Sequence, residues 1–212
     1  WSIIFIKIFL KQKLFIYEVN HLDELRQNAN LKDFIKKNII KFLVKILYRY
    51  PDIIAANSKE LSVDLENFTG QKIYTLYNPC FEKVKIKNKK YKSKNTMNIL
   101  NISRFEDQKD HSTLLKAIKI SKIKNRINLT LVGYGKNYHK IKAFINKNKI
   151  KAKIILNEKK IDKYYRQADL YICSSIYEGL PTTVIEAASN CVPIICSDFK
   201  SGSKEILKNG KA

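Results

Sequence analysis

The sequence predicts an α/β protein of two domains, each built on a doubly wound parallel β-sheet. Short apolar runs of strand type alternate with segments of helical periodicity along most of the 212 residues, and this alternation is the signature of βαβ units. It is interrupted by the Lys-rich segment 82–95, EKVKIKNKKYKSKN, whose composition is that of a linker. We therefore place the first domain at residues 1–81 and the second at residues 96–212.

The first domain alternates strands and helices. Segment 31–49 has apolar residues at helical spacing with lysines between them, and Pro51 ends it. DIIAANS is a short apolar run that ends in polar residues, and Gly70 breaks the chain before the next strand. We predict strands over 13–19, 52–58 and 72–79, and helices over 31–49 and 59–67.

The second domain repeats this alternation with five strands. Runs such as MNILNIS and INLTLVG are typical of buried parallel strands, and five strands separated by helices predict a Rossmann-like domain. The predicted strands are 97–103, 127–133, 153–157, 169–175 and 192–198. The predicted helices are 111–124, 137–147, 161–168, 182–189 and 202–208.

The chain is strongly basic. Its formal net charge is +22, from 41 Lys and Arg against 19 Asp and Glu. This charge attracts phosphorylated ligands, an acidic membrane surface or nucleic acid, although the abundance of Lys, Ile and Asn fits an AT-rich genome equally well. Because the lysines are spread through every segment and no nucleic-acid-binding signature occurs, we expect no nucleic-acid partner.

Cysteine and histidine spacing gives no support for a metal site. Cys173, Cys191 and Cys196 lie in apolar runs, which predicts buried free thiols in a reducing cytoplasm. No CxxC, D-x-D, zinc-type or Ser-His-Asp pattern occurs, so we expect no metal and no cofactor. No run of about 18 uncharged apolar residues is present, so we expect no transmembrane helix.

The stretch SSIYEGLPTTVIEAASN, residues 174–190, places Glu178 in the loop after a strand and Glu186 inside the following helix. Ligands of parallel sheets bind beyond the carboxyl ends of strands, where helix N-termini present free N–H groups. Gly179 permits close backbone approach, and Pro181 suits the first helical turn. Both carboxylates could then face one crevice and accept hydrogen bonds from a sugar diol. On spacing alone, the simpler interpretation is that they only stabilise the helix dipole.

Arg104 and Lys109 follow the strand NILNIS at the same predicted edge of the sheet. Two cations there suit a diphosphate, Arg through a planar fork and Lys as a point charge. The alternative is two solvated cations in a Lys-rich chain. Gly133 and Gly135 form a GxG after the next strand, which fits either a nucleotide-binding turn or a simple tight turn.

The histidines are weaker candidates. His21 follows a strand end in the first domain, where a lone His is more often structural. We interpret His111 as a residue at a helix start and His139 as a surface residue.

Four strings, in this order, resemble a known family: NISRFEDQKDHSTLLKAI, LVGYGKNYHKI, ADLYICSSIYEGLPTTVIEAASNCVPIICSD and GSKEILKNG. They resemble the retaining nucleotide-sugar glycosyltransferases of the group 1, or family 4, type. The resemblance is close over 97–212 and looser over 14–80, and its most specific part is E-x7-E with R-x4-K upstream. It implies the GT-B fold, with the first domain incomplete and the second lacking its C-terminal end.

The resemblance also implies roles for single residues. Arg104 and Lys109 would hold the donor diphosphate, Glu186 the nucleotide ribose, and Glu178 the hydroxyls of the donor sugar beside the reacting bond. His21 is a further catalytic candidate, because a His in that region of the family often lies near the donor sugar. The remaining implied contacts are with the sugar and phosphate (Gly179, Leu180, Pro181) or close to the nucleotide (Gly133, Gly135, Thr182).

The sequence departs from the family pattern at several places. Cys191 and Asn157 stand at turns where the family commonly has Gly, and YEVNHLDE around His21 does not align cleanly. The family's glycine loop and first strands have no counterpart, nor have its C-terminal helices. Because an initiator Met is also missing, we expect the chain to be a piece of a longer protein.

The resemblance implies a retaining, metal-independent glycosyltransferase, which agrees with the absence of a D-x-D pattern. It would move a sugar from a nucleotide-sugar donor to a glycan or lipid-linked glycan acceptor in cell-surface polysaccharide synthesis. We expect it in the cytoplasm, with the basic helix 31–49 touching an anionic membrane, unless that helix only packs its apolar face on the sheet. The alternatives are a non-catalytic nucleotide-sugar-binding protein and another GT-B enzyme, such as a nucleotide-sugar epimerase or a phosphorylase.

Overall fold

The computed structural model describes residues 12–20, 31–80 and 95–210, which form two compact units. The first unit contains the chain up to Asn78 together with 177–180 and 200–210; the second contains 79–176 and 181–199. The predicted linker 82–95 lies almost entirely outside the described residues.

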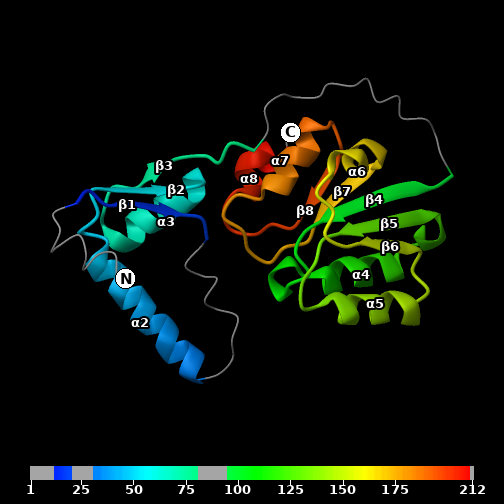
Figure 1. Cartoon of the computed structure of the whole chain (residues 1–212), viewed down its shortest axis with the longest axis horizontal. Coiled ribbons are helices and arrows are strands. Elements are labelled where there is room, and N and C mark those ends of the chain that lie inside the picture. Colours follow the sequence, from blue (N-terminus) through cyan, green and yellow to red (C-terminus); the bar gives the residue numbers. More distant parts are fainter. Residues whose placement is uncertain (1–11, 21–30, 81–94, 211–212) are drawn as a thin grey trace. The chain divides into compact units, whose positions relative to one another are not determined.

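The first unit is built on a three-stranded parallel sheet in the order β1-β2-β3 (Figure 1). Its strands are β1 (Phe15–Glu18), β2 (Ile53–Ala56) and β3 (Tyr74–Thr75). Helices α2 (Leu31–Leu47) and α3 (Lys59–Thr69) contribute Val44, Leu61 and Leu65 to one apolar cluster, which also contains Tyr48, just after α2, and the sheet residues Ile54 and Ala56.

The second unit contains a five-stranded, all-parallel sheet in the order β6-β5-β4-β7-β8. Its central strand is β4 (Met97–Ile102). The chain runs outward from β4 to one edge through β5 (Ile127–Val132) and β6 (Ala152–Ile155), then returns to the other side of β4 through β7 (Leu170–Cys173) and β8 (Ile194–Cys196). This is the doubly wound topology that the sequence predicts.

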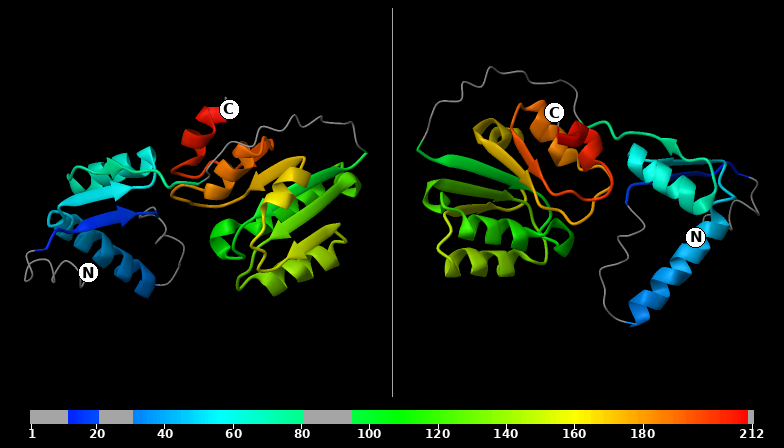
Figure 2. Two further views of the ribbon diagram at one scale, coloured as in Figure 1. Left: turned by 45° about the horizontal axis from the view of Figure 1, so that its top comes forward. Right: turned by 180° about the vertical axis from the view of Figure 1, so that it is seen from behind.

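Helices cover both faces of this second sheet (Figures 1 and 2). On one face, α4 (His111–Ile120) and α5 (Tyr138–Lys147) supply Leu114, Leu115, Ile118, Ile141 and Ile145 to a core cluster with Ile99, Leu129 and Leu131 of the strands. On the other face lie α6 (Asp162–Gln167) and α7 (Thr182–Ser189). The inner strands β4 and β5 are largely buried, which explains their nearly continuous apolar sequences.

Residues 200–210 belong to the first unit because two carboxylates join them to the start of α3. Glu205, in α8 (Ser203–Ile206), accepts hydrogen bonds from the backbone N–H of Lys59 and from the hydroxyl of Tyr77. In return, Glu60 accepts from the backbone N–H of Gly202 at 2.9 Å. Each carboxylate stabilises a helix N-terminus, which is where negative charge is favourable.

Each predicted strand and helix appears, with shifts at the ends. The strand predicted over 72–79 is reduced to two residues, and the helix predicted over 111–124 ends at Ile120, before a separate 3₁₀ turn over Lys124–Arg126. The burial predicted for the cysteines holds for Cys173 only. Cys191 is exposed because it forms the tight turn between α7 and β8, with φ of 53°.

Among the described residues, no helix combines the length and the apolar composition needed to cross a bilayer.

Candidate functional site

The strand order of the second sheet creates a topological switch point between β4 and β7. The connection after β4 leads to one side of the sheet, and the connection after β7 leads to the other. In sheets of this kind, a crevice opens between the carboxyl ends of the two diverging strands, and ligands bind there. Arg104 and Lys109 follow β4 and the start of α7 follows β7, so all three come after the carboxyl ends of neighbouring strands.

The loop after β4 carries the two predicted cations. Arg104 is exposed, and its Nη2 lies 3.5 Å from Oε1 of the buried Gln108. Lys109 is half-buried at the end of a 3₁₀ turn, Asp107–Lys109. The loop is fixed to its neighbour after β7: Ser174 Oγ donates to the carbonyl of Lys109 at 2.8 Å, and the Ile176 N–H donates to the carbonyl of Gln108 at 2.8 Å.

The GxG after β5 packs directly beneath this cationic loop. A Cβ on Gly133 would lie 1.9 Å from the carbonyl oxygen of Ser103, and one on Gly135 would lie 2.6 Å from that of Phe105. The backbone of the two loops is also joined, because the Phe105 N–H donates to the Tyr134 carbonyl at 2.6 Å. The glycines thus let the two loops pack in contact, which holds the backbone on either side of Arg104.

The loop after β7 leads into α7, which begins at Thr182 as predicted. Pro181 is the N-cap residue of this helix, directly before the predicted helix 182–189, and it is buried. The N-cap side chain accepts no hydrogen bond from this helix, and the first turn contains no acidic residue. A helix N-terminus of this kind suits an anionic ligand.

Glu186 lies on α7 and is half-buried. Its Oε2 accepts a hydrogen bond of 2.8 Å from the hydroxyl of Tyr165, a residue of α6 with no exposed surface. Burial raises the pKa of the Glu186 carboxyl, the Tyr165 hydrogen bond lowers it, and nearby Asp162 raises it, with a net rise. Sequence reasoning missed Tyr165, because a Tyr in a short helix resembles any aromatic core residue.

Glu178, Gly179 and Leu180 belong to the other compact unit, so the structure does not bring Glu178 together with Glu186 in one described body. Within the first unit, Gly179 is buried against the end of β1: a Cβ there would lie 1.9 Å from the carbonyl oxygen of Val19. The glycine is therefore required by close approach to protein backbone. His21 lies outside the described residues.

A buried histidine that sequence reasoning assigned only to a helix start supports the cationic loop. His111 is the first residue of α4, 3% exposed, with its ring edge-on to Phe105 and its Nε2 3.0 Å from Ser103 Oγ. Burial lowers the pKa of His111 to about 4, with Lys109 lowering it further and Asp110 raising it. His111 is therefore a neutral packing residue at physiological pH.

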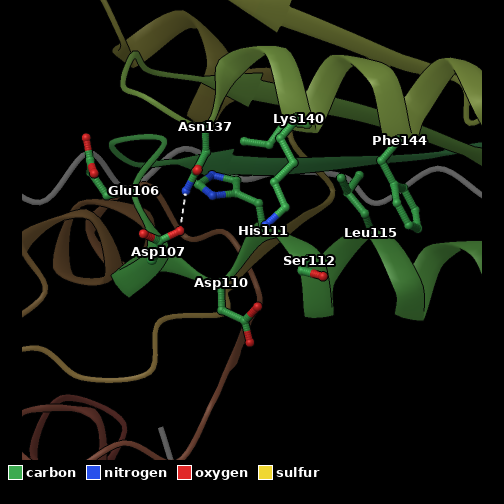
Figure 3. Close-up of a pocket in the computed structure, with 10 residues that line it drawn as sticks. Glu106, Asp107, Asp110, His111, Ser112, Leu115, Asn137, Lys140 and Phe144 are labelled. Atoms are coloured by element: carbon green, nitrogen blue, oxygen red, sulfur yellow. Dashed lines mark hydrogen bonds between the residues drawn. The ribbon is translucent and has the colours of Figure 1, made fainter. Parts of the chain in front are cut away.

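A cavity of about 150 Å³ lies between α4 and α5, beside the same loop (Figure 3). Its acidic groups have partners within the protein. Asp107 binds Lys136 Nζ at 2.7 Å and Asn137 Nδ2 at 2.8 Å, and Asp110 caps α4. We therefore assign the acidic groups of this cavity to holding the loops in place.

A larger groove, of about 590 Å³, lies between α4 and the strands β4, β7 and β8. Its lining is mainly aliphatic, including Leu114, Ile172 and Ile195, and much of it is the face of the parallel sheet. Parallel sheets are normally covered on both faces, so this groove has the character of a packing surface. The groove reaches the loop after β7 at the switch point, because Ser174, Ser175 and Ile176 are among its lining residues.

Comparison with known proteins identifies the family. The model of the glycosyl transferases group 1 family matches residues 82–212. The chain belongs to this family. An uncharacterized glycosyltransferase of Methanocaldococcus jannaschii is 30% identical over 190 residues, covering 83% of this chain and 47% of the relative. The chain thus spans about half the length of the curated relatives it matches.

A second relative is more specific in its name. The N-acetylgalactosamine-N,N'-diacetylbacillosaminyl-diphospho-undecaprenol 4-alpha-N-acetylgalactosaminyltransferase of Campylobacter jejuni is 27% identical over 191 residues, 84% of this chain and 50% of the relative.

Solved structures agree on the fold. The Staphylococcus aureus protein TarM, crystallised with UDP, has a TM-score of 0.72 at 21% identity, covering 92% of this chain and 38% of its own. Anabaena HepE with UDP has a TM-score of 0.72 at 15% identity, covering 96% and 58%. This group 1 chain therefore has the GT-B fold that the sequence predicts.

Proposed function

We propose that this chain forms the donor-binding side of a retaining glycosyltransferase. The enzyme would transfer a sugar from a nucleoside-diphosphate donor to a glycan or lipid-linked glycan acceptor in cell-surface polysaccharide synthesis. The carrying observation is the switch point, where the Ser174–Lys109 hydrogen bond joins the cationic loop after β4 to the segment that follows β7, and where α7 begins further along that connection. A nucleoside diphosphate matches this arrangement, because its phosphates need cations and N–H donors.

Relatives support the substrate class. The Campylobacter jejuni enzyme is named for transfer to a diphospho-undecaprenol-linked sugar, and two of the solved GT-B structures contain UDP. We therefore choose UDP as the first ligand to test and a lipid-linked glycan as the first acceptor class.

Each site residue then has a task. Arg104 and Lys109 offset the negative charge that develops on the departing nucleoside diphosphate, which is the main demand of this reaction. Glu186 accepts hydrogen bonds from the ribose, and Glu178 binds the hydroxyls of the donor sugar beside the reacting bond, with His21 as a second candidate there. The remaining contacts are Gly179, Leu180 and Pro181 near the sugar and Gly133, Gly135 and Thr182 near the nucleotide.

The proposal is tested on the protein in its complete natural form. A panel of nucleotide sugars is screened by thermal shift, since a bound donor raises the melting temperature by mass action. The stabilising donor is then supplied with acceptor, and NMR of the product reports the anomeric configuration. A product that keeps the donor configuration supports the proposal. Failure of every nucleotide sugar to bind would refute it, and binding without transfer would favour the non-catalytic alternative.

We also propose that no metal ion assists the departure of the diphosphate, because two side-chain cations and a helix N-terminus supply the charge. Transfer rates measured with and without excess EDTA should agree within about twofold. A loss of activity in EDTA that Mg²⁺ or Mn²⁺ restores would contradict this part of the proposal.

The helix α2 gives a reason to propose peripheral membrane contact. One side of the helix packs into the first unit through Val44, and Tyr48, just after the helix, joins the same apolar cluster. Apolar side chains that are about half exposed or more follow one another on another side: Phe34, Ile35, Ile39 and Phe42. Exposed Lys36 and Lys45 lie on the same helix. An apolar stripe accompanied by cations fits the surface of an anionic bilayer.

Vesicle sedimentation tests this contact. Phe34→Ser with Phe42→Ser should reduce binding to phosphatidylglycerol vesicles at least about tenfold, because two buried aromatic rings are removed from the lipid. Val63→Ser on α3, which also removes an exposed apolar side chain, serves as the control and should bind as the wild type does. Equal binding by all three proteins would count against a role for α2.

A further inference from the structure

The two most buried aromatic side chains near α7 are both tyrosines, and each hydroxyl meets this helix. Tyr165 comes from α6 and Tyr171 from β7, and their exposed fractions are 0% and 1%. Their ring centroids are 5.9 Å apart. A buried Tyr needs a hydrogen-bond partner for its hydroxyl, and these two take different partners.

Tyr165 contacts the carboxylate of Glu186. Its hydroxyl lies 2.8 Å from Glu186 Oε2 and 3.2 Å from the carbonyl oxygen of Thr183. Tyr171 contacts the Thr183 side chain instead, with its hydroxyl 2.8 Å from Oγ1 and 3.2 Å from the carbonyl oxygen of Ile102. The two tyrosines are therefore a matched pair, of which one touches the carboxylate and the other does not.

In the hydrogen bond between Tyr165 and Glu186, the tyrosine hydroxyl is the donor. Burial first, and then Tyr171 and Glu186, raise the pKa of Tyr165, so the phenol stays protonated and donates. Within the described ranges, no donor lies at hydrogen-bond distance from Oε1, the second oxygen of Glu186. The carboxylate is thus held from the protein side by one oxygen, while the other keeps its full capacity to accept.

We propose that Tyr165 is a positioning residue for nucleotide recognition: it fixes Glu186 so that the carboxylate accepts hydrogen bonds from the 2′ and 3′ hydroxyls of the donor ribose. The inference rests on the proposed function. Fixing the carboxylate beforehand removes the side-chain entropy that a long, mobile Glu would lose on binding. Because the fixed group accepts only, a ribose that lacks its 2′ hydroxyl loses a hydrogen bond that the site is arranged to make.

The test compares UDP with 2′-deoxy-UDP by calorimetry on the complete protein. Wild type should prefer UDP. Tyr165→Phe keeps the buried ring and removes only the hydroxyl; we expect it to weaken UDP binding about tenfold and to narrow the preference over 2′-deoxy-UDP. Tyr171→Phe makes the same chemical change one ring away and should leave that preference unchanged. Equal effects of the two variants would overturn the positioning role.

A pH profile separates positioning from general loss of structure. The titratable groups that act on or beside Glu186 are Tyr165 and Asp162 of α6 and the thiol of Cys80. Since the Tyr165 hydrogen bond lowers the pKa of Glu186, its loss should move the acidic limit of UDP binding to higher pH. An unchanged acidic limit in Tyr165→Phe would contradict the inference. A Tyr171→Phe limit equal to that of wild type supports it.

If Tyr165→Phe is unstable, a double-mutant cycle still tests the positioning role of Tyr165. Glu186→Gln removes the charge, after which Tyr165→Phe should add little further loss of UDP affinity. Full additivity would show that the two residues act independently and would reject the inference. If wild type binds neither UDP nor GDP nor their deoxy forms, the proposed function itself fails; if wild type prefers ribose and Tyr165→Phe keeps that preference, only the role of Tyr165 fails.

Discussion

The N-termini of α4 and α7 stand after neighbouring strands of one sheet, yet they are finished in opposite ways. Asp110 closes the start of α4: its side chain accepts from the Thr113 N–H at 3.1 Å and from the Thr113 hydroxyl at 2.6 Å. At α7 the N-cap is Pro181, which has no side-chain acceptor. The N-terminus of α4 is therefore capped by a carboxylate of the protein, whereas the N-cap residue of α7 offers no such acceptor and the proposed ligand is an anion.

This difference indicates how, under the proposed function, the two sides of the site would bind a diphosphate through different groups. The closed end of α4 cannot attract phosphate, because Asp110 already satisfies the helix dipole. On that side, attraction comes from the side chains of Arg104 and Lys109 in the preceding loop. On the β7 side, the first turn of α7 carries no acidic residue, so backbone N–H groups can serve. Under the proposed function, side-chain cations after β4 and the backbone dipoles of α7 would together bind the diphosphate.

The largest expected effect comes from removing the cations. Arg104→Ala with Lys109→Ala should weaken UDP binding by about 100- to 10,000-fold, because each of the two lost hydrogen bonds to a charged group contributes about 1.5–3 kcal/mol. Binding of uridine, which lacks the phosphates, should change little. Calorimetry with both ligands measures this difference.

The control for this prediction removes the same number of charges from the same region. Lys116 and Lys119 are exposed on α4, and replacing both with Ala lowers the net charge equally. If this variant loses as much UDP affinity as the Arg104/Lys109 variant, general electrostatic attraction would explain the effect and the clamp would be wrong.

The second effect concerns the packing that holds the cationic loop. Gly133→Ala should destabilise the protein by about 3 kcal/mol, because the new methyl group meets a backbone carbonyl that cannot rotate away. Gly70→Ala is the matched control: Gly70 has φ of 69°, and a Cβ there would meet no atom within 4 Å, so only backbone strain of about 1 kcal/mol is expected. Urea unfolding compares the two, and similar losses would show that the contact with Ser103 is unimportant.

Much of this architecture is predictable from sequence because it depends on burial. Most apolar residues of the run INLTLV are buried in the core, so their pattern alone indicates a strand; the run forms β5 (Ile127–Val132) within the predicted range 127–133. The residues of the crevice could be proposed for a similar reason, since strand ends in a parallel sheet lie at one edge. Local pattern and topology suffice for these features.

Other features depend on contacts that no local pattern encodes. The hydrogen bond between Tyr165 and Glu186 requires α6 and α7 to lie on the same face of the sheet, which the 21-position separation between the two residues does not specify. Likewise, nothing in EGLP indicates that Gly179 packs on the Val19 carbonyl in the first unit. The turn positions Cys191 and Asn157, by contrast, were found through resemblance to glycine positions, and both have φ of 53°.

The third prediction concerns the pH dependence of the free energy of unfolding that His111, at the start of α4, causes. The ordinary pKa of a histidine is near 6.5, and the pKa of His111 in the folded protein is about 4, so the folded state binds fewer protons in this interval. Stability is therefore complete above pH 6.5 and falls as the pH approaches 4, by about 2–3 kcal/mol in total. Urea unfolding at several pH values measures this slope.

His111→Phe keeps a ring at this position and removes the titration. Its stability should fall less steeply between pH 6.5 and 4 than that of wild type, even if the loss of the Ser103 contact lowers its stability at pH 7. His139→Phe, at an exposed position of α5, should retain the wild-type slope. Parallel curves for wild type and His111→Phe would show that another group causes the pH dependence.

The smallest expected effect concerns two residues with a left-handed backbone conformation, Asp110 before α4 and Cys191 after α7. Asp110 and Cys191 have φ of 40° and 53°, a conformation that costs a non-Gly residue roughly 1–2 kcal/mol. Glycine would remove this strain at both positions, although its greater freedom in the unfolded chain offsets about 0.4–1 kcal/mol. Asp110→Gly also loses the cap of α4, so its net effect on the free energy of unfolding should stay within a few tenths of a kcal/mol.

Cys191→Gly loses no cap and should stabilise the protein by about 0.5 kcal/mol. Thermal unfolding of the two variants would contradict the comparison if Asp110→Gly proved the more stable, because the Asp110 carboxylate would then contribute nothing to closing its helix.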